Sequence, residues 1–139
     1  MKLWQTDWEK FVEAVAQRFS ESMDDVHLTN EFAGNKVVWS GSIRNIELGQ
    51  EDSNGIAMDM PDVKIRLLDG RLLVANYIFL LVEPSKQEAW DKFSAGETVT
   101  FATFIRESNS IFPEVQVSIN SNNPESILML GTENALPVS

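Results

Sequence analysis

The chain contains no cysteine and only one histidine, and these shortages exclude several kinds of chemistry. Without cysteine there is no disulfide, no thiolate nucleophile and no cysteine-ligated zinc site. The single His27 cannot form a histidine metal cluster within one chain. No stretch approaches the roughly 20 consecutive apolar residues of a membrane span, and the first residues lack the apolar core of a signal peptide. We therefore expect a cytoplasmic protein that has no membrane association, no bound metal and no cofactor.

Familiar signatures of catalysis and phosphate binding are also missing. The seven glycines are too dispersed to form a phosphate-binding loop. Residues 51–55 offer oxygen ligands, but they lack the alternating spacing and the terminal glutamate of a calcium loop. Asp59 and Asp62 resemble paired carboxylates, but a glycosidase pair also needs a cleft and one raised pKa, which this pattern does not indicate. We predict that the protein is not an enzyme and has no catalytic residues.

Positive charge is scarce, since 21 acidic residues face 11 basic ones and the net charge is -10. Such a field repels a duplex or a long single strand of nucleic acid. The segment 32–71 is nearly neutral, because it holds five basic and six acidic residues. A local basic face can therefore exist on an otherwise acidic protein.

The clearest local signal is a hairpin, because two alternating runs are joined by Asp69-Gly70. A two-residue turn at this point places Ile65 opposite Val74 and Lys64 opposite Ala75. One face of the hairpin is then wholly apolar and the other carries Lys64, Arg66 and Arg71. The predicted inner residues are Val63, Ile65, Leu67, Leu72 and Val74.

An amphipathic helix is predicted over residues 7–22. Thr6 and Glu9 form a capping-box pattern at its start. Apolar residues recur at spacings of three and four along one stripe, and the opposite face is charged. We expect the stripe to pack on the protein's own domain rather than to anchor a partner. Its members are Trp4, Trp8, Phe11, Val12, Val15, Phe19 and Met23.

The remaining pattern indicates strands with one short helix among them. We predict strands over 37–46, 56–68, 72–82, 98–106 and 114–119, and a helix over 84–93. Gly41 interrupts the inner face of the first strand, which is typical of a bulge or a sharp coil in a closing sheet. The apolar run 127–130 fits a strand or a helix equally well, and 132–139 is expected to be a loose tail. The whole chain, 1–139, is expected to be a single domain.

Three strands, a short helix and two further strands form the element order of the oligonucleotide/oligosaccharide-binding (OB) fold, a partly open Greek-key barrel. The chain resembles this fold in the glycine-containing strand 38–43, in the long strands around Asp69-Gly70, and in the helix-to-strand passage 90–101. The resemblance covers roughly residues 36–120. It implies a mainly β protein: a five-stranded OB-like Greek-key barrel with an N-terminal amphipathic helix and a short helix between strands three and four.

The resemblance also implies where a ligand would bind. In OB-like domains the usual surface is the outer face of strands two and three, here bordered by the loops 49–55 and 107–113. Arg44 and Phe104 take neighbouring outward positions, and the second loop offers an apolar pair. The candidate binding face is then Arg44, Lys64, Arg66, Arg71, Leu73, Tyr77, Phe104, Ile111 and Phe112.

The composition of this face decides between possible ligands. Nucleic-acid binding needs stacking aromatics and a basic groove, whereas Tyr77 and Phe104 are the predicted outward aromatics and Glu51-Asp52 makes the first loop acidic. We therefore predict a non-catalytic module that binds a protein partner or a second copy of itself, as in a homodimer. The alternative is OB-type binding of a short single-stranded nucleic acid or an oligosaccharide. A third possibility is an acidic inhibitor of the immunity-protein kind, which covers a basic partner.

Overall fold

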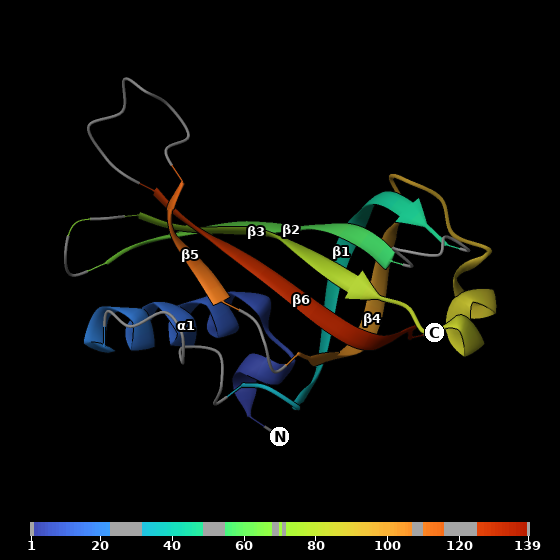
Figure 1. The fold of residues 1–139 in the computed structure, drawn as a ribbon, viewed down its shortest axis with the longest axis horizontal. Helices are drawn as coiled ribbons and strands as arrows, with labels where there is room; N and C mark the ends of the chain where they lie inside the picture. Colours follow the sequence, from blue (N-terminus) through green and yellow to red (C-terminus); the bar gives the residue numbers. More distant parts are fainter. Residues whose placement is uncertain are drawn as a thin grey trace.

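The computed structural model describes residues 2–22, 32–48, 55–67, 70, 72–106, 110–115 and 125–138. No helix within these ranges is long and apolar enough to cross a membrane. The elements follow one another in the order shown in Figure 1. They are η1 (Leu3–Gln5), α1 (Trp8–Ser22), β1 (Lys36–Glu47), β2 (Gly55–Arg66), β3 (Leu72–Leu81), η3 (Pro84–Trp90), β4 (Thr98–Ile105), β5 (Ser110–Val115) and β6 (Glu125–Pro137).

Five of the strands close into a ring. Their order is β3-β2-β1-β4-β6, and a parallel pairing between β6 and β3 completes the circle. Every other pairing in the ring is antiparallel. With η3 between β3 and β4, this is the five-stranded Greek-key barrel of the OB fold. The predicted fold class is therefore confirmed.

The strand that closes the ring differs from the expectation. The fifth strand is predicted over 114–119, of which 116–119 lie outside the described residues; β5 begins earlier, at Ser110, and pairs within the described residues only with β6. The ring is closed by β6, which contains the unassigned run 127–130 and also residues 132–137, the expected tail. The barrel thus extends beyond residue 120. Register irregularities against β3 and β4, together with Asn134 at φ +56°, break the alternation that would have revealed this strand.

The β2–β3 hairpin lies one residue away from the predicted register. Ile65 pairs with Leu73 and Lys64 with Val74. The Gly70 N–H donates a 3.0 Å hydrogen bond to the Leu67 carbonyl, and Gly70 has φ +93°. These features match a longer turn that ends on a left-handed glycine, not a two-residue turn. Because side chains alternate, the slip moves Leu73 to the inside. By register Leu72 and Val74 lie on the side of the pair that carries Lys64, but Val74 is only 7% exposed, so the prediction that it is buried holds.

Gly41 marks the point where β1 exchanges partners. Residues 36–42 of β1 pair with β4, whereas residues 42–47 pair with β2. A Cβ atom on Gly41 would lie 2.7 Å from the Met60 sulfur and 2.9 Å from the Asp59 carbonyl oxygen. The missing side chain therefore lets β2 approach β1 closely. The irregularity of the β1–β2 register lies between Ile43 and Asn45 and not at Gly41, where a bulge or sharp coil was predicted.

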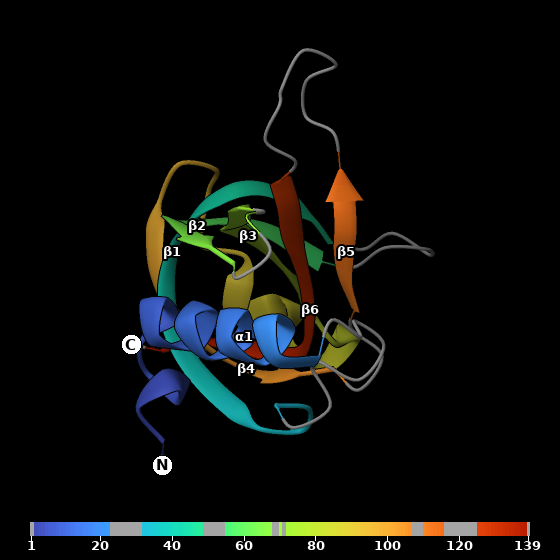
Figure 2. The same cartoon turned by 90° about the vertical axis from the view of Figure 1, so that its left-hand side faces the viewer.

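The helix α1 lies across one end of the ring of strands (Figure 2). The middle of its apolar stripe is buried against the barrel, with Phe11 fully covered and Trp8 only 5% exposed. The side chains of Phe19 and Met23 lie outside the described residues. The Trp8 indole packs edge-on against Trp39, and Phe11 contacts Phe32. The predicted helix and its intramolecular packing are both confirmed.

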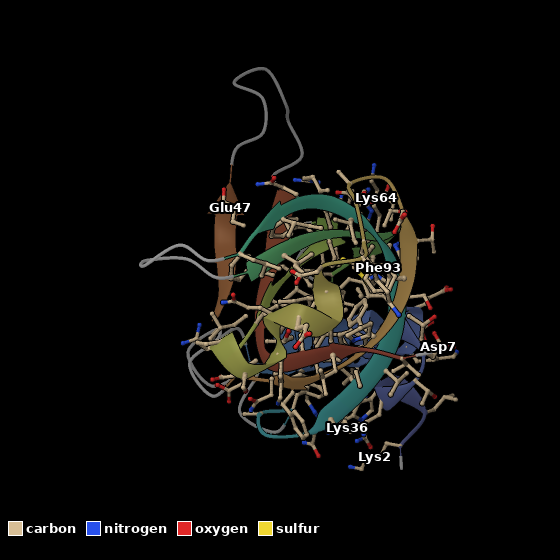
Figure 3. The ribbon with its side chains drawn as sticks, turned by 90° about the vertical axis from the view of Figure 1, so that its right-hand side faces the viewer. Lys2, Asp7, Lys36, Glu47, Lys64 and Phe93 are labelled. Atoms are coloured by element: carbon tan, nitrogen blue, oxygen red, sulfur yellow. The ribbon has the colours of Figure 1, made fainter. Side chains whose placement is uncertain are left out.

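The segment η3 lies at the opposite end of the barrel (Figure 3). The helix expected over 84–93 is a 3-10 helix that ends at Trp90. The Trp90 side chain is 0% exposed, and its indole N–H donates a 3.0 Å hydrogen bond to the Ala135 carbonyl. This bond ties η3 to the closing strand β6.

Candidate functional site

Three side chains meet on the outer face of β1, β2 and β3. Asp59 lies opposite Ser42 on one side and Tyr77 on the other. Arg44 lies where the β1–β2 register shifts, between Ile43 and Asn45. Its Nε donates a 2.6 Å hydrogen bond to the Asp59 carboxylate. Its guanidinium carbon lies 4.9 Å from the centre of the Tyr77 ring. Two of the predicted site residues, Arg44 and Tyr77, are thereby brought into contact.

The charge on Arg44 is stabilised by its neighbour. The hydrogen bond with Asp59 raises the pKa of the guanidinium further above its already high ordinary value. The Arg44 side chain remains 54% exposed. A guanidinium that stays charged and accessible beside an aromatic ring can stack on a planar ligand.

Phe79 extends this surface along β3, and the sequence interpretation missed it. It lies two residues from Tyr77 and opposite Ala57, so both aromatic side chains point to the same face. A Cβ atom on Gly55 would clash with the Phe79 ring, so the glycine makes room for it. Arg44, Asp59, Tyr77 and Phe79 are called the aromatic face below.

Phe79 was missed because the inward and outward alternation of side chains reverses within the β2–β3 pair. The register shifts between Asp59 and Val63, next to Pro61 and Asp62. Ile78 and Leu80 point inward on one side of this shift, and Leu73 points inward on the other. Strict alternation through the strand therefore places Leu73 on the same face as Tyr77, which is wrong. Leu73 is 0% exposed and belongs to the core.

The other predicted cations have partners nearby. The Lys64 amine lies 3.8 Å from the Asp62 carboxylate. A terminal nitrogen of Arg66 donates a 2.8 Å hydrogen bond to the Gly70 carbonyl in the turn. Arg71 lies outside the described residues. The described part of this face is therefore close to neutral, and charged residues such as Lys36, Glu47 and Lys64 lie on different sides of the barrel (Figure 3).

The remaining predicted site residues do not join the aromatic face. Phe104 is half-buried on β4, opposite Lys36 at the first position of β1, whereas Arg44 lies near the end of β1. Ile111 and Phe112 belong to β5 and not to a loop, where they pair with β6, and their side chains lie outside the described residues. The loop residues 49–54 and 107–109 are likewise outside the described part of the chain.

Comparison with known proteins adds two distant structural neighbours. No family model matches the chain, and no curated protein matches its sequence. A Klebsiella pneumoniae lipoprotein proposed to bind nucleic acid is 16% identical; the match covers 92% of this chain and 88% of that chain, with a TM-score of 0.43. A mitochondrial single-stranded DNA-binding protein from S. cerevisiae is 13% identical over 76% of this chain and 95% of that chain, with a TM-score of 0.36. Because both TM-scores are low, the fold assignment depends on the strand order and pairing of this chain itself.

Proposed function

We propose that the protein is a non-catalytic OB-type module that binds a short single-stranded nucleic acid on the aromatic face. One observation carries the proposal: Tyr77, with Arg44 stacked beside it, and Phe79 line the outer surface of the central strands. Bases stack on aromatic rings and on guanidinium planes with little dependence on sequence. Stacking is therefore the interaction that this surface offers best.

The charge distribution limits what kind of nucleic acid fits. Arg44 and Lys64 already face carboxylates, and the whole chain carries a net charge of -10. Few phosphates would be neutralised on binding, so few counterions would be released. We expect the ligand to be short and its affinity to depend only weakly on salt.

Fluorescence anisotropy with a labelled oligothymidylate of about eight nucleotides tests the proposal. We expect Tyr77→Ala to weaken binding by about tenfold, because one stacked base contributes about 1–3 kcal/mol. Phe104→Ala is the matched control, since it removes an aromatic side chain outside the aromatic face. Absence of binding by the natural protein, or an equal loss in both variants, would overturn the proposal.

A second candidate is association with a protein, including another copy of this chain, through the same face. The specific observation in its favour is that Arg44 is paired with Asp59 while Tyr77 and Phe79 remain half-buried. Aromatic residues and arginine are enriched at protein interfaces. Sedimentation velocity over a concentration series tests it: a dimer that Tyr77→Ala dissociates supports this function, and a monomer at every concentration excludes self-association.

A further inference from the structure

The strands β1 and β2 separate beyond Gly41 and leave strand edges open. Their pairing ends at Ser42 and Asp59, whereas β1 continues to pair with β4 as far as Lys36. Within the described residues, no strand pairs with the β2-facing edge of β1 from Lys36 to Gly41. The stretch of β2 from Val63 onward pairs only with β3 in the same ranges. An open edge carries backbone donors and acceptors that can pair with another chain.

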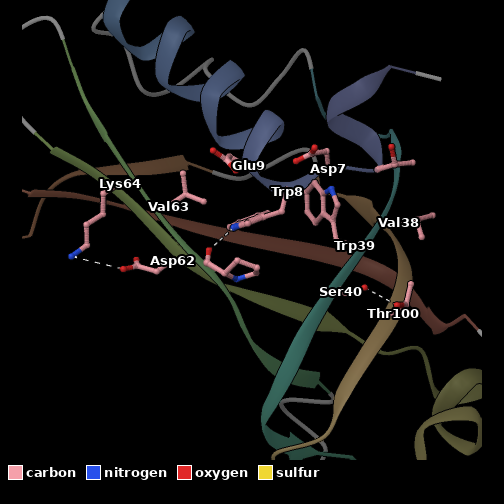
Figure 4. A pocket seen from close by; sticks show the side chains of 12 residues that line it. Asp7, Trp8, Glu9, Val38, Trp39, Ser40, Asp62, Val63, Lys64 and Thr100 are labelled. Atoms are coloured by element: carbon pink, nitrogen blue, oxygen red, sulfur yellow. Dashed lines mark hydrogen bonds and ion pairs between the residues drawn. The ribbon is translucent and has the colours of Figure 1, made fainter.

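A cleft of about 760 Å³ occupies this position, bounded by β1, β2 and the start of α1 (Figure 4). The indoles of Trp8 and Trp39 lie between the two strands, with 5.0 Å between their ring centres. Trp8 is held in place by a 2.9 Å hydrogen bond from its indole N–H to the Pro61 carbonyl. Both indoles are almost fully buried, so they form a rigid wall of the cleft. Its size is that of a typical small-ligand or short-peptide site.

The open edge of β1 faces this cleft. The Lys36 carbonyl accepts a 2.9 Å hydrogen bond from the Gln5 side chain, so it points away from β4. In an antiparallel strand every second residue directs its N–H and C=O to the same side. The backbone groups of Val38 and Ser40 therefore also point away from β4, and both residues line the cleft.

The cleft favours a positively charged occupant. Asp7, Glu9 and Asp62 line it, and Lys64 is its one basic lining residue, placed 3.8 Å from Asp62. The uncharged polar part of the lining includes a hydroxyl pair, Ser40 and Thr100, joined at 2.6 Å. Negative charge thus exceeds positive charge beside an open strand edge.

We propose that this cleft binds an extended basic segment of a partner protein, which adds a strand to the open edge of β1. Backbone hydrogen bonds would supply affinity, as in other cases of strand addition, and the acidic lining would select a lysine or arginine side chain. The cleft shares no lining residue with the aromatic face. The two sites can therefore be tested separately.

Anisotropy with a labelled peptide of about six residues, alternating lysine and threonine, tests the proposal; its length matches the stretch of β1 from Lys36 to Gly41, where the Lys36 carbonyl is already bonded to Gln5 and the groups of Val38 and Ser40 are offered to the peptide. We expect binding that falls about tenfold or more in the double variant Glu9→Gln/Asp62→Asn. The control Glu13→Gln/Glu88→Gln changes the net charge equally at exposed positions away from the cleft, and it should bind normally. Tyr77→Ala should also leave peptide binding unchanged, which separates this site from the aromatic face.

A second peptide, N-methylated at alternate residues, removes the donors that strand addition needs. We expect its affinity to be lower by about tenfold or more than that of the parent peptide. No binding of the parent peptide, equal losses in the two double variants, or equal binding of the N-methylated peptide would each overturn the proposal. Displacement of the peptide by spermine at equal amine concentration would also overturn it, because the site would then recognise a small cation and not a strand.

Discussion

The two ends of the barrel are closed by the same device with different results. At one end Trp90, from the short η3, donates its indole N–H to the Ala135 carbonyl of β6. At the other end Trp8, from the 15-residue α1, donates its indole N–H to the Pro61 carbonyl of β2. The first acceptor is buried, whereas the second belongs to an exposed residue that borders the cleft.

This difference indicates that the two ends of the barrel have different roles. At the η3 end the indole is completely covered and joins two parts of the chain 45 residues apart. At the α1 end the strands β1 and β2 have already separated, so the helix seals the core without filling the space between the strand edges. One end serves stability, and the other combines stability with an accessible surface.

The largest effect is expected from Trp90→Ala. Removal of a fully buried indole leaves a cavity at the η3 end and should lower the free energy of unfolding by about 3–5 kcal/mol. Urea unfolding followed by circular dichroism measures this loss. Phe93→Ala, at a half-buried neighbour in ring contact with Trp90, is the control and should lose less. Equal losses of unfolding free energy in the two variants would show that burial of Trp90 does not stabilise this end of the barrel more than Phe93 does.

The next effect is expected from Gly41→Ala, at the point where the cleft opens. The new Cβ atom would crowd the Met60 sulfur and the Asp59 carbonyl oxygen, and a backbone atom cannot move aside cheaply. Overpacking of this kind costs about 1–3 kcal/mol. Thermal unfolding should show a lower midpoint temperature for Gly41→Ala. The midpoint should hardly change for Ser40→Ala, at the exposed neighbouring position. An unchanged midpoint would contradict the close approach of β1 and β2.

A smaller difference should separate two conservative substitutions, Trp90→Phe and Trp8→Phe. Each removes one indole donor. The Ala135 carbonyl would then be buried without its partner, whereas water can reach Pro61 beside the cleft. We expect Trp90→Phe to cost about 1 kcal/mol more than Trp8→Phe in urea unfolding. If Trp8→Phe cost more than Trp90→Phe, water would reach the Pro61 carbonyl less easily than the Ala135 carbonyl.

The smallest effect is expected on the outer face between the ends. Arg44→Ala removes an ion pair whose two side chains are about half exposed, so it should change the free energy of unfolding by no more than about 0.5 kcal/mol. Urea unfolding measures this change, and a loss above about 1 kcal/mol would show that Arg44 supports the barrel. If the change is small, any loss of binding by Arg44→Ala can be attributed to the missing side chain and not to unfolding.

Local patterns were enough to predict much of the fold. The spacing of Trp8, Phe11 and Val15 locates α1, because a helical stripe repeats within a few residues. The alternation in β1 and β4 follows from the same short-range information. The aromatic face was found in part, since Arg44 and Tyr77 were predicted to point outward.

The turn length, the strand register and the pairing of β6 could not be predicted from local patterns. The Asp69-Gly70 pair is compatible with more than one turn length, and the choice sets whether Leu73 faces the core. The shift near Pro61 then reverses the phase, which hid the outward position of Phe79. The register of β6 shifts against each of its partners, β3, β4 and β5, so no single alternation runs through it.

The position of β6 in the chain also restricts how the barrel can assemble. This strand joins β3 to β4, and no other strand among the described residues bridges the two. During synthesis the earlier strands emerge first, and the ring stays incomplete until residues 125–137 leave the ribosome. Until then the edges of β3 and β4 that β6 will cover remain unpaired. Late closure of this kind makes the nascent protein depend on protection of those edges, a demand that the finished barrel no longer makes.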